Sequence, residues 1–295
     1  MIALTMALLM APARAADPQF AAFPHGQPQD EGPGVNSGMR ADGHRYFVWR
    51  HDRGVMRIYD DETRTTRDAA VPDECRLQDT STGVALLHCG GSEGGPRILL
   101  LRSGSVIRPA GAGLADQDGY AEIGRHWLET LHHDGAESIP YFLNWRTGER
   151  RSARSILPLH DLDDPKLGVA PPGTRIIFQR EGPYTLRTRR ARGKSRWEPL
   201  VLERRGHPTE VLSSCRGAAC ESASISEGLV TWSEELGRVR AYDIRRGRLF
   251  RWVFHDWPGT IRVMHTRRRV LTHGPGEPRC MCPDPPYALW VRVRK

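Results

Sequence analysis

Apolar residues along the chain fall into short runs that are separated by polar residues, glycine and proline. The stretch at 46–60, YFVWRHDRGVMRIYD, contains an apolar run ending in Trp49, a polar turn with Gly54, and a second apolar run ending in Tyr59 and Asp60. Two such runs on either side of turn residues are typical of a β-hairpin. The pattern therefore predicts short strands joined by turns.

The same pattern returns far along the chain, at 228–243, as GLVTWSEELGRVRAYD. A shift of 183 positions places Trp232 on Trp49 and Asp243 on Asp60 without a gap. After each acidic or amide residue comes a tight turn: Gly247 follows Asp243, and Gly148 follows an asparagine in the same way. Asp and Asn shape such turns through their side chains, and Gly adopts the positive φ that closes them.

Weaker copies of the hairpin lie between and after these two. They read GVALLHC with PRILLLRSG, HWLETLHH with IPYFLNWRTG, TRIIFQREGPYTLRTRR, and RRVLTHG with YALWVRVRK. The first strand of each of the six hairpins ends at Trp49, Cys89, Leu131, Phe178, Trp232 and Thr272, and these positions are 40, 42, 47, 54 and 40 residues apart. A period of about 40–45 residues, with enough chain for four strands in each unit, predicts blades arranged around an axis.

This repeat resembles the β-propeller superfamily. The stretch LVTWSEELGRVRAYDIRRG has the order of strand, turn, strand, Tyr-Asp and turn that TolB-like and WD-type blades show, although the Gly-His and Trp-Asp pairs of WD repeats are absent. We expect an all-β fold with a single β-propeller over residues 41–295, built from about six four-stranded blades, five to seven being the range. The segment 16–40 is expected to contribute the ring-closing strand, and the alternating LWVRVRK suits the blade that closes the ring.

The composition and the first residues of the sequence suggest an exported protein. The 30 glycines and 22 prolines suit a fold made of many turns. An apolar run at 2–10 is followed by Ala13-Arg14-Ala15, which predicts a signal peptide over residues 1–15, although no Lys or Arg precedes Arg14. A buried N-terminal strand is the alternative. No stretch approaches the ~18 apolar residues of a membrane span.

Six cysteines fit an oxidising compartment. Cys75 and Cys89 lie in one predicted blade, so a disulfide between them is expected. Cys215 and Cys220 lie in one loop, CRGAAC, and either pair with each other or cross-pair with Cys280 and Cys282. A metal site built from the stretch HGPGEPRCMC lacks the usual Cys-x2-Cys spacing, and no metal ligands are predicted.

Histidines and acids gather at the predicted turns on one rim of the ring. In such a position a His with a carboxylate could bind a ligand or exchange protons with it, whereas the same residues are also ordinary turn formers. These candidate ligand-binding residues are His51, Asp52, His132, His133, Asp134, His160, Glu234, Glu235 and His273. No cofactor is predicted, but Ca²⁺ or another cation on the axis would suit this rim, for example at the DLDD stretch at 161–164.

The net charge of +8 comes from arginines in scattered groups, such as 187–196, 245–248 and 267–269. These groups are either a solvated surface or an attraction to an acidic polymer. Gly-x-Ser-x-Gly, His-Glu-x-x-His and phosphate-loop motifs are absent. We therefore expect an exported, non-catalytic module that binds a protein or an anionic cell-envelope polymer, not nucleic acid. The alternative is a propeller glycosidase or lyase that uses the His, Asp and Glu residues of the rim.

Overall fold

The short apolar runs form β-strands throughout the computed structural model of the protein. The structure describes residues 21–23, 39–90, 94–112, 118–134, 137–152, 175–189, 199–216, 223–234, 237–254, 261–273 and 288–294. These residues form 24 strands in six antiparallel sheets of four strands each, and they contain no α-helix. Accordingly, this part of the chain has no helix with the length and apolar character to cross a lipid bilayer.

Each sheet is one blade, and its strands are called a, b, c and d from the middle of the ring outward. Blades one to three consist of β2 (Arg40–Ala41), β3 (Tyr46–Asp52), β4 (Val55–Asp60) and β5 (Thr65–Ala70); β6 (Cys75–Ser81), β7 (Val84–Cys89), β8 (Gly95–Leu100) and β9 (Ser105–Ile107); and β10 (Asp118–Ile123), β11 (Trp127–Asp134), β12 (Glu137–Asn144) and β13 (Arg150–Ser152).

Blades four to six continue in the same order. They consist of β14 (Arg175–Glu181), β15 (Tyr184–Arg189), β16 (Pro199–Arg204) and β17 (Glu210–Arg216); β18 (Ser224–Ser226), β19 (Leu229–Glu234), β20 (Arg238–Asp243) and β21 (Arg248–Val253); and β22 (Arg262–His265), β23 (Arg269–His273), β24 (Ala288–Arg292) and β1 (Ala21–Ala22). Strand d of blade six is thus β1, which pairs antiparallel with β24.

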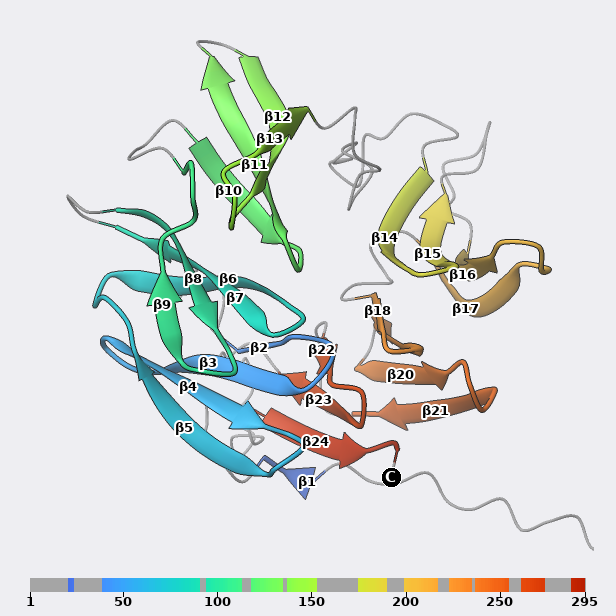
Figure 1. Ribbon diagram of the computed structural model, residues 1–295. Coiled ribbons are helices and arrows are strands. Elements are labelled where there is room, and N and C mark those ends of the chain that lie inside the picture. The colour runs from blue at the N-terminus through green and yellow to red at the C-terminus, as the bar shows by residue number, and fades with distance from the viewer. Residues whose placement is uncertain are drawn as a thin grey trace, which may run out of the picture.

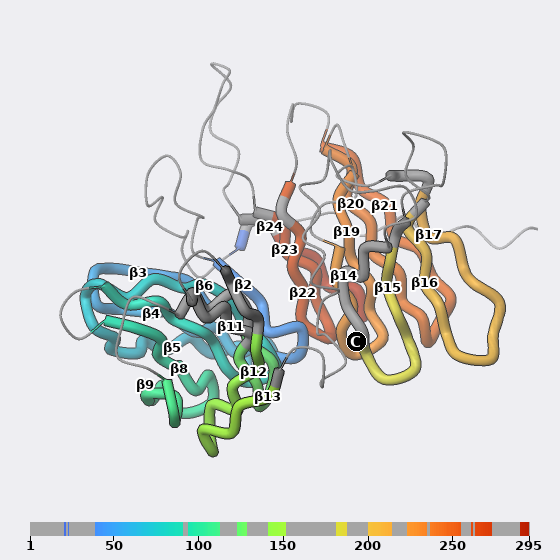
Figure 2. The backbone as a smooth tube through the Cα atoms, turned by 90° about the horizontal axis from the view of Figure 1, so that it is seen from above, coloured from blue at the N-terminus to red at the C-terminus, as the bar shows by residue number. Residues whose placement is uncertain are grey.

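The blades follow one another around a ring in Figure 1, from β2–β5 at the lower left, through β10–β13 at the top, to β22–β24 at the lower centre. The inner strands of consecutive blades are in contact, as β2 is with β6, β6 with β10 and β14 with β18. In the perpendicular view of Figure 2, β15 to β17 stand side by side with their turns at the two ends. The molecule is a six-bladed β-propeller, which confirms the fold class predicted from the repeat.

The hydrophobic core lies between the blades. Five clusters of buried side chains are described, and each joins two consecutive blades. In β3, Phe47 and Trp49 point toward blade six, whereas Tyr46 and Val48 point toward blade two. Because side chains alternate across a strand, a strand with neighbours on both faces needs a continuous apolar run. This is why the runs in the sequence are continuous.

One hairpin occupies a different position in its blade from the one that the repeat predicts. By analogy with the other hairpins, which are strands b and c, the repeat predicts that TRIIFQREGPYTLRTRR also forms strands b and c. In the structure its strands, β14 and β15, are strands a and b, and β16 follows as strand c. The prediction was wrong by one strand. The inner strand β14 has seven residues and an apolar run that resembles a strand b, whereas the inner strands β2 and β18 have only two and three residues and show no such run.

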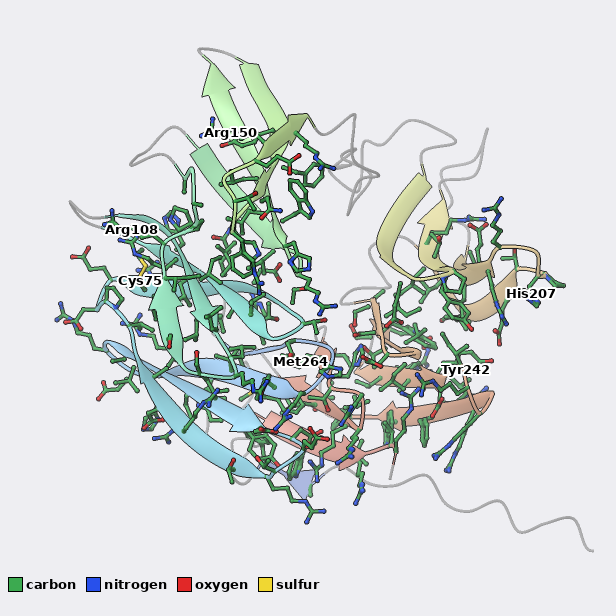
Figure 3. All side chains as sticks on the ribbon, viewed as in Figure 1. Cys75, Arg108, Arg150, His207, Tyr242 and Met264 are labelled. Atoms are coloured by element: carbon green, nitrogen blue, oxygen red, sulfur yellow. A yellow bond between two sulfur atoms is a disulfide. The ribbon has the colours of Figure 1, made fainter. Side chains whose placement is uncertain are left out.

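The disulfide within blade two is present. Cys75 and Cys89 are directly paired across β6 and β7, with their Cα atoms 3.8 Å apart and their sulfurs bonded (Figure 3). This confirms the bridge expected from the sequence. The backbone of Cys215 lies in β17, and Cys220, Cys280 and Cys282 lie outside the described residues, so the pairing of these four stays a prediction.

Candidate binding face

The ring has two faces that are built from different connections. Because neighbouring strands are antiparallel, the a–b and c–d turns leave from one end of a blade, and the b–c and d–a connections leave from the other. We call these ends the tight-turn face and the long-loop face. The c–d turns of blades one to five are residues 61–64, 101–104, 145–149, 205–209 and 244–247.

A side-chain oxygen at the end of strand c shapes three of these turns. Asn144 Oδ1 accepts the backbone N–H of Arg146 at 3.1 Å, and Asp60 and Asp243 make the same bond in their own turns. Gly148, four residues after Asn144, has a φ of 77°, which is the left-handed conformation that closes the turn. The Asp/Asn-to-Gly pattern in the sequence therefore marks real turns.

Arg64 stands where the c–d turns of blades two, three and five have glycine. It follows Asp60 as Gly148 follows Asn144, and it is held at a φ of 59° with an exposed side chain. A left-handed residue other than glycine costs about 1 kcal/mol. Among the described residues, no ion pair or side-chain hydrogen bond of Arg64 offsets this cost. Strain that the surrounding structure does not explain motivates a hypothesis of function for that residue.

Exposed arginines occur in each of these five c–d turns. They are Arg64, Arg102, Arg146, Arg205, Arg245 and Arg246, and we call them the arginine rim. None of them forms an ion pair with an acidic side chain within the described part of the chain. Arg146 stacks on Trp145, with its guanidinium carbon 4.7 Å from the ring centroid. The rim therefore presents positive charge to solvent.

The acids of the tight-turn face are bound within the protein. Asp61 and Asp243 are buried and pair with Arg269 and Arg294. Within the described ranges, every acid of this face makes at least one hydrogen bond or ion pair: Asp42, Asp60, Asp61, Glu62, Glu149, Glu181, Glu210, Glu227 and Asp243. Internal partners thus engage these acids, whereas the rim arginines have no acidic partner within the described ranges.

Local contacts lower the pKa of two of these acids, Asp243 and Asp60. Burial opposes the ionisation of Asp243, but the hydrogen bonds from Arg294 and from two backbone N–H groups hold its pKa below the usual range. Asp60 behaves in the same way, with Arg45 as its partner. Tyr242 remains neutral, because burial and its hydrogen bond with Glu210 raise its pKa to about 12.

The sequence candidates belong to the long-loop face. The b strands end there, and they carry His51 with Asp52 and the backbone of 132–134 and His273. His51 is half-buried, and Asp52 is exposed and accepts the backbone N–H of Arg53 at 2.7 Å, an ordinary turn contact. The side chains of His132, His133, Asp134 and His273, and all of His160 and Glu235, lie outside the described residues. Their role in binding stays a prediction.

Glu234 is the other described candidate, and its carboxylate is occupied by neighbours. It accepts hydrogen bonds from the Ser213 hydroxyl and, at 3.1 Å, from Trp232 Nε1, and it pairs with Arg240 at 3.2 Å. These contacts join β17 of blade four to β19 and β20 of blade five. They favour a structural role for Glu234.

The described ranges contain no group of three or more His, Cys, Asp or Glu residues that could hold a metal ion. The DLDD stretch at 161–164 lies outside those ranges. A cation on the axis is therefore an expectation from the sequence alone.

Sequence reasoning did not identify the arginine rim. It grouped arginines that lie close together in the chain, and Arg64, Arg102, Arg146 and Arg205 belong to none of those groups. The signal that could have found them is their phase in the repeat, because each follows the end of a strand c within four residues.

Comparisons with known proteins add similarities of fold. No protein-family model matches the sequence, and no curated protein is significantly similar to it. TolB from Acinetobacter baumannii is similar in structure, with a TM-score of 0.39 and 13% identity over 74% of this chain and 52% of that one. The chain thus spans about half the length of that TolB.

Two oligogalacturonate lyases are also similar in structure. One was solved in complex with manganese and has a TM-score of 0.37 and 10% identity, covering 88% of this chain and 78% of that chain. The lyase from Vibrio parahaemolyticus has a TM-score of 0.39 and 11% identity, covering 89% and 78%.

Proposed function

We propose that the protein is an exported, non-catalytic binding module and that its arginine rim binds an anionic polysaccharide of a cell envelope. One observation carries the proposal. The exposed arginines of five consecutive c–d turns have no acidic partner among the described residues, whereas the acids of the same face are bound internally. A guanidinium group can bind a carboxylate through two parallel hydrogen bonds, which suits an acidic sugar.

The distribution of the arginines favours an extended partner over a small anion. Each exposed ion pair contributes about 1 kcal/mol or less, so useful affinity requires several contacts at once. The rim arginines are spread over five blades, and only a long molecule could reach several of those blades at once. The strained backbone of Arg64 supports the same view, since glycine would fit that turn better.

Export is supported by the bond between Cys75 and Cys89, because disulfides form and persist mainly in oxidising compartments. The apolar run at 2–10, predicted as part of a signal peptide, agrees with this proposal.

A glycosidase or lyase is the second candidate. The ends of the b strands bring His51, Asp52 and the 132–134 segment to one face of the ring, which is where an acid and a base could meet a sugar. Such an enzyme would release fragments from its polymer, so the binding experiment can also test this candidate.

The test is co-sedimentation of the protein with insoluble polygalacturonate, a polymer with a carboxylate on every sugar, and with neutral dextran. We expect binding to polygalacturonate at low salt, loss of binding at high salt, and none to dextran. The triple variant Arg64→Gly, Arg102→Gln and Arg246→Gln should bind at least about tenfold more weakly.

The matched control is Arg76→Gln, Arg238→Gln and Arg251→Gln, which removes equal charge from exposed positions outside the tight-turn face. We expect it to change binding less than about twofold. Equal losses in the two triple variants would mean general attraction to net charge. Absence of binding would contradict the polymer proposal and favour a protein partner. Unsaturated or shortened fragments in the supernatant would identify an enzyme.

A further inference from the structure

A cavity in the outer wall of the ring, between blades two and three, shares Arg146 with the arginine rim and is otherwise lined by residues outside the rim. Its volume is about 330 Å³, within the range of small-molecule pockets. It is lined by Leu100, Ile107, Arg108, Ala110, Trp145 and Arg146. These residues come from the ends of β8 and β9, from the connection after β9, and from the c–d turn of blade three.

Backbone contacts hold the two sides of the cavity together. The N–H of Ala110 donates to the carbonyl oxygen of Trp145 at 2.9 Å. Gly111 lies so close to Gly148 that a Cβ on Gly111 would be 3.0 Å from the Gly148 Cα. Arg150 adds a hydrogen bond from its guanidinium to the carbonyl of Gly111 at 2.9 Å. Ala110 and Gly111 are therefore fastened to the turn, and the cavity exists before any ligand binds.

The cavity has an apolar floor and a cationic mouth. Leu100 and Ile107 pack against the cluster that contains Trp145, and Trp145 is 2% exposed. Its indole N–H is directed to the carbonyl of Gly124, at 3.4 Å. Arg108 and Arg146 are exposed, and none of the described residues that line the cavity is acidic.

We propose that this cavity binds a small organic anion in which one carboxylate is attached to a compact apolar group, such as an aryl ring. The apolar group would fill the floor formed by Leu100, Ile107 and Ala110, and the carboxylate would lie against the guanidinium groups of Arg108 and Arg146. Burial of the apolar part supplies affinity, and the arginines select for the negative charge. The inference holds whether or not the arginine rim binds a polymer.

The test is a fluorine NMR titration of the full protein with 4-fluorobenzoate and with neutral 4-fluorobenzamide. We expect millimolar binding of the benzoate and at least about tenfold weaker binding of the benzamide. Ala110→Leu fills the floor and keeps the N–H that bonds Trp145, and it should weaken benzoate binding at least about tenfold. Arg146→Gln should weaken benzoate binding by roughly fivefold and leave benzamide binding unchanged.

Ile107→Phe fills the cavity from the other side, and it keeps the test valid if Ala110→Leu fails to fold. Polygalacturonate binding should be the same in Ala110→Leu as in the unchanged protein, so failure of one proposal is separable from failure of the other. Equal affinity for the benzoate and the benzamide, no binding at all, or binding that is insensitive to both filled variants would overturn the assignment.

Discussion

Arg294, which follows β24, binds three turns of two blades through one side chain. It donates to both carboxylate oxygens of Asp243, at 2.7 and 2.8 Å, and to the carbonyl oxygens of Glu227 at 2.8 Å and Gly228 at 2.7 Å. A weaker bond at 3.4 Å reaches the carbonyl of Arg267. The planar guanidinium is suited to this arrangement, because it directs several donors at once while remaining charged.

Replacing Arg294 by alanine should therefore destabilise the protein by about 3 kcal/mol, since Asp243 would be left buried and without a counter-charge. Arg294→Lys should recover only part of this loss, because an ammonium group cannot reproduce the fork. Denaturant unfolding measures both. Arg246→Ala, an exposed arginine in the turn after Asp243, is the control and should change stability by less than about 0.5 kcal/mol. Similar losses in Arg294→Ala and Arg246→Ala would contradict this account.

Arg64 gives a prediction in which stability and binding change in opposite directions. Arg64→Gly relieves the positive φ, so we expect the free energy of unfolding to rise by about 0.5–1 kcal/mol. The same change removes one charge of the arginine rim and should weaken polygalacturonate binding. Thermal unfolding and co-sedimentation check the two halves. A variant that is less stable would show that the guanidinium has a structural partner instead.

His265 makes the stability of the protein depend on pH. It is 3% exposed, and burial lowers its pKa from 6.5 to about 4, so the folded protein holds it neutral. The unfolded chain takes up a proton near pH 6.5, and stability is therefore lost as the pH falls from 6.5 toward 4. The loss reaches about 3 kcal/mol in total.

Unfolding measured between about pH 7.5 and about pH 5 should show this decline. The asparagine in His265→Asn cannot take up the proton. Its amide can occupy the place of the histidine Nδ1, which is 3.2 Å from the carbonyl oxygen of Thr266. The variant should therefore lose less stability than the unchanged protein over this range. If both lose the same amount, other groups cause the decline.

At the scale of elements, the strands that the sequence reveals are those with neighbours on both faces. Strands b and c are covered on both sides, so β3 and β19 appear as continuous apolar runs. Strand a is recognisable only where it is long, and the two residues of β2 leave no pattern at all. This is why the hairpins were predictable and the position of β14 was not.

The disulfide is the covalent link of strand a to strand b in blade two. Cys75 and Cys89 are 14 residues apart, and a loop of this size stabilises a fold by about 3 kcal/mol, mainly through the unfolded chain. We expect the double variant Cys75→Ala and Cys89→Ala to lose about this much, and hydrogen exchange in β6 to become faster. Unfolding that is unchanged in the double variant would mean that packing alone fixes β6.

At the scale of the whole molecule, prediction from sequence was limited by distance along the chain. The long-loop face was predictable because its candidates, such as His51 and Asp52, lie at the ends of recognisable strands. The arginine rim was not, because its members come from five blades and share one face only when the ring closes. The cavity likewise needs the connection after β9 to lie against a turn of the next blade. Such sites depend on packing that no local pattern encodes.

Closure of the ring depends on β1, because it is the outer strand of a blade whose other strands come from the opposite end of the chain. Phe23, just after β1, is 5% exposed. Its ring has edge contacts, with centroids 5.2 to 6.0 Å apart, to rings of both blade one and blade six: Phe47, Trp49, Tyr59 and Trp290. One side chain thus anchors the junction between the first and last blades.

Phe23→Ala should therefore cost about 3–5 kcal/mol, and the loss should extend beyond β1. A ring without this anchor opens at the junction of blades six and one, so hydrogen exchange should become faster in β24, β23 and β3 together. Val211→Ala removes an apolar side chain that is 63% exposed, and it should change neither quantity. If hydrogen exchange becomes faster only in β1, the junction is held without Phe23, by the contact of β2 with β22 and by the ion pair of Arg269 with Asp61.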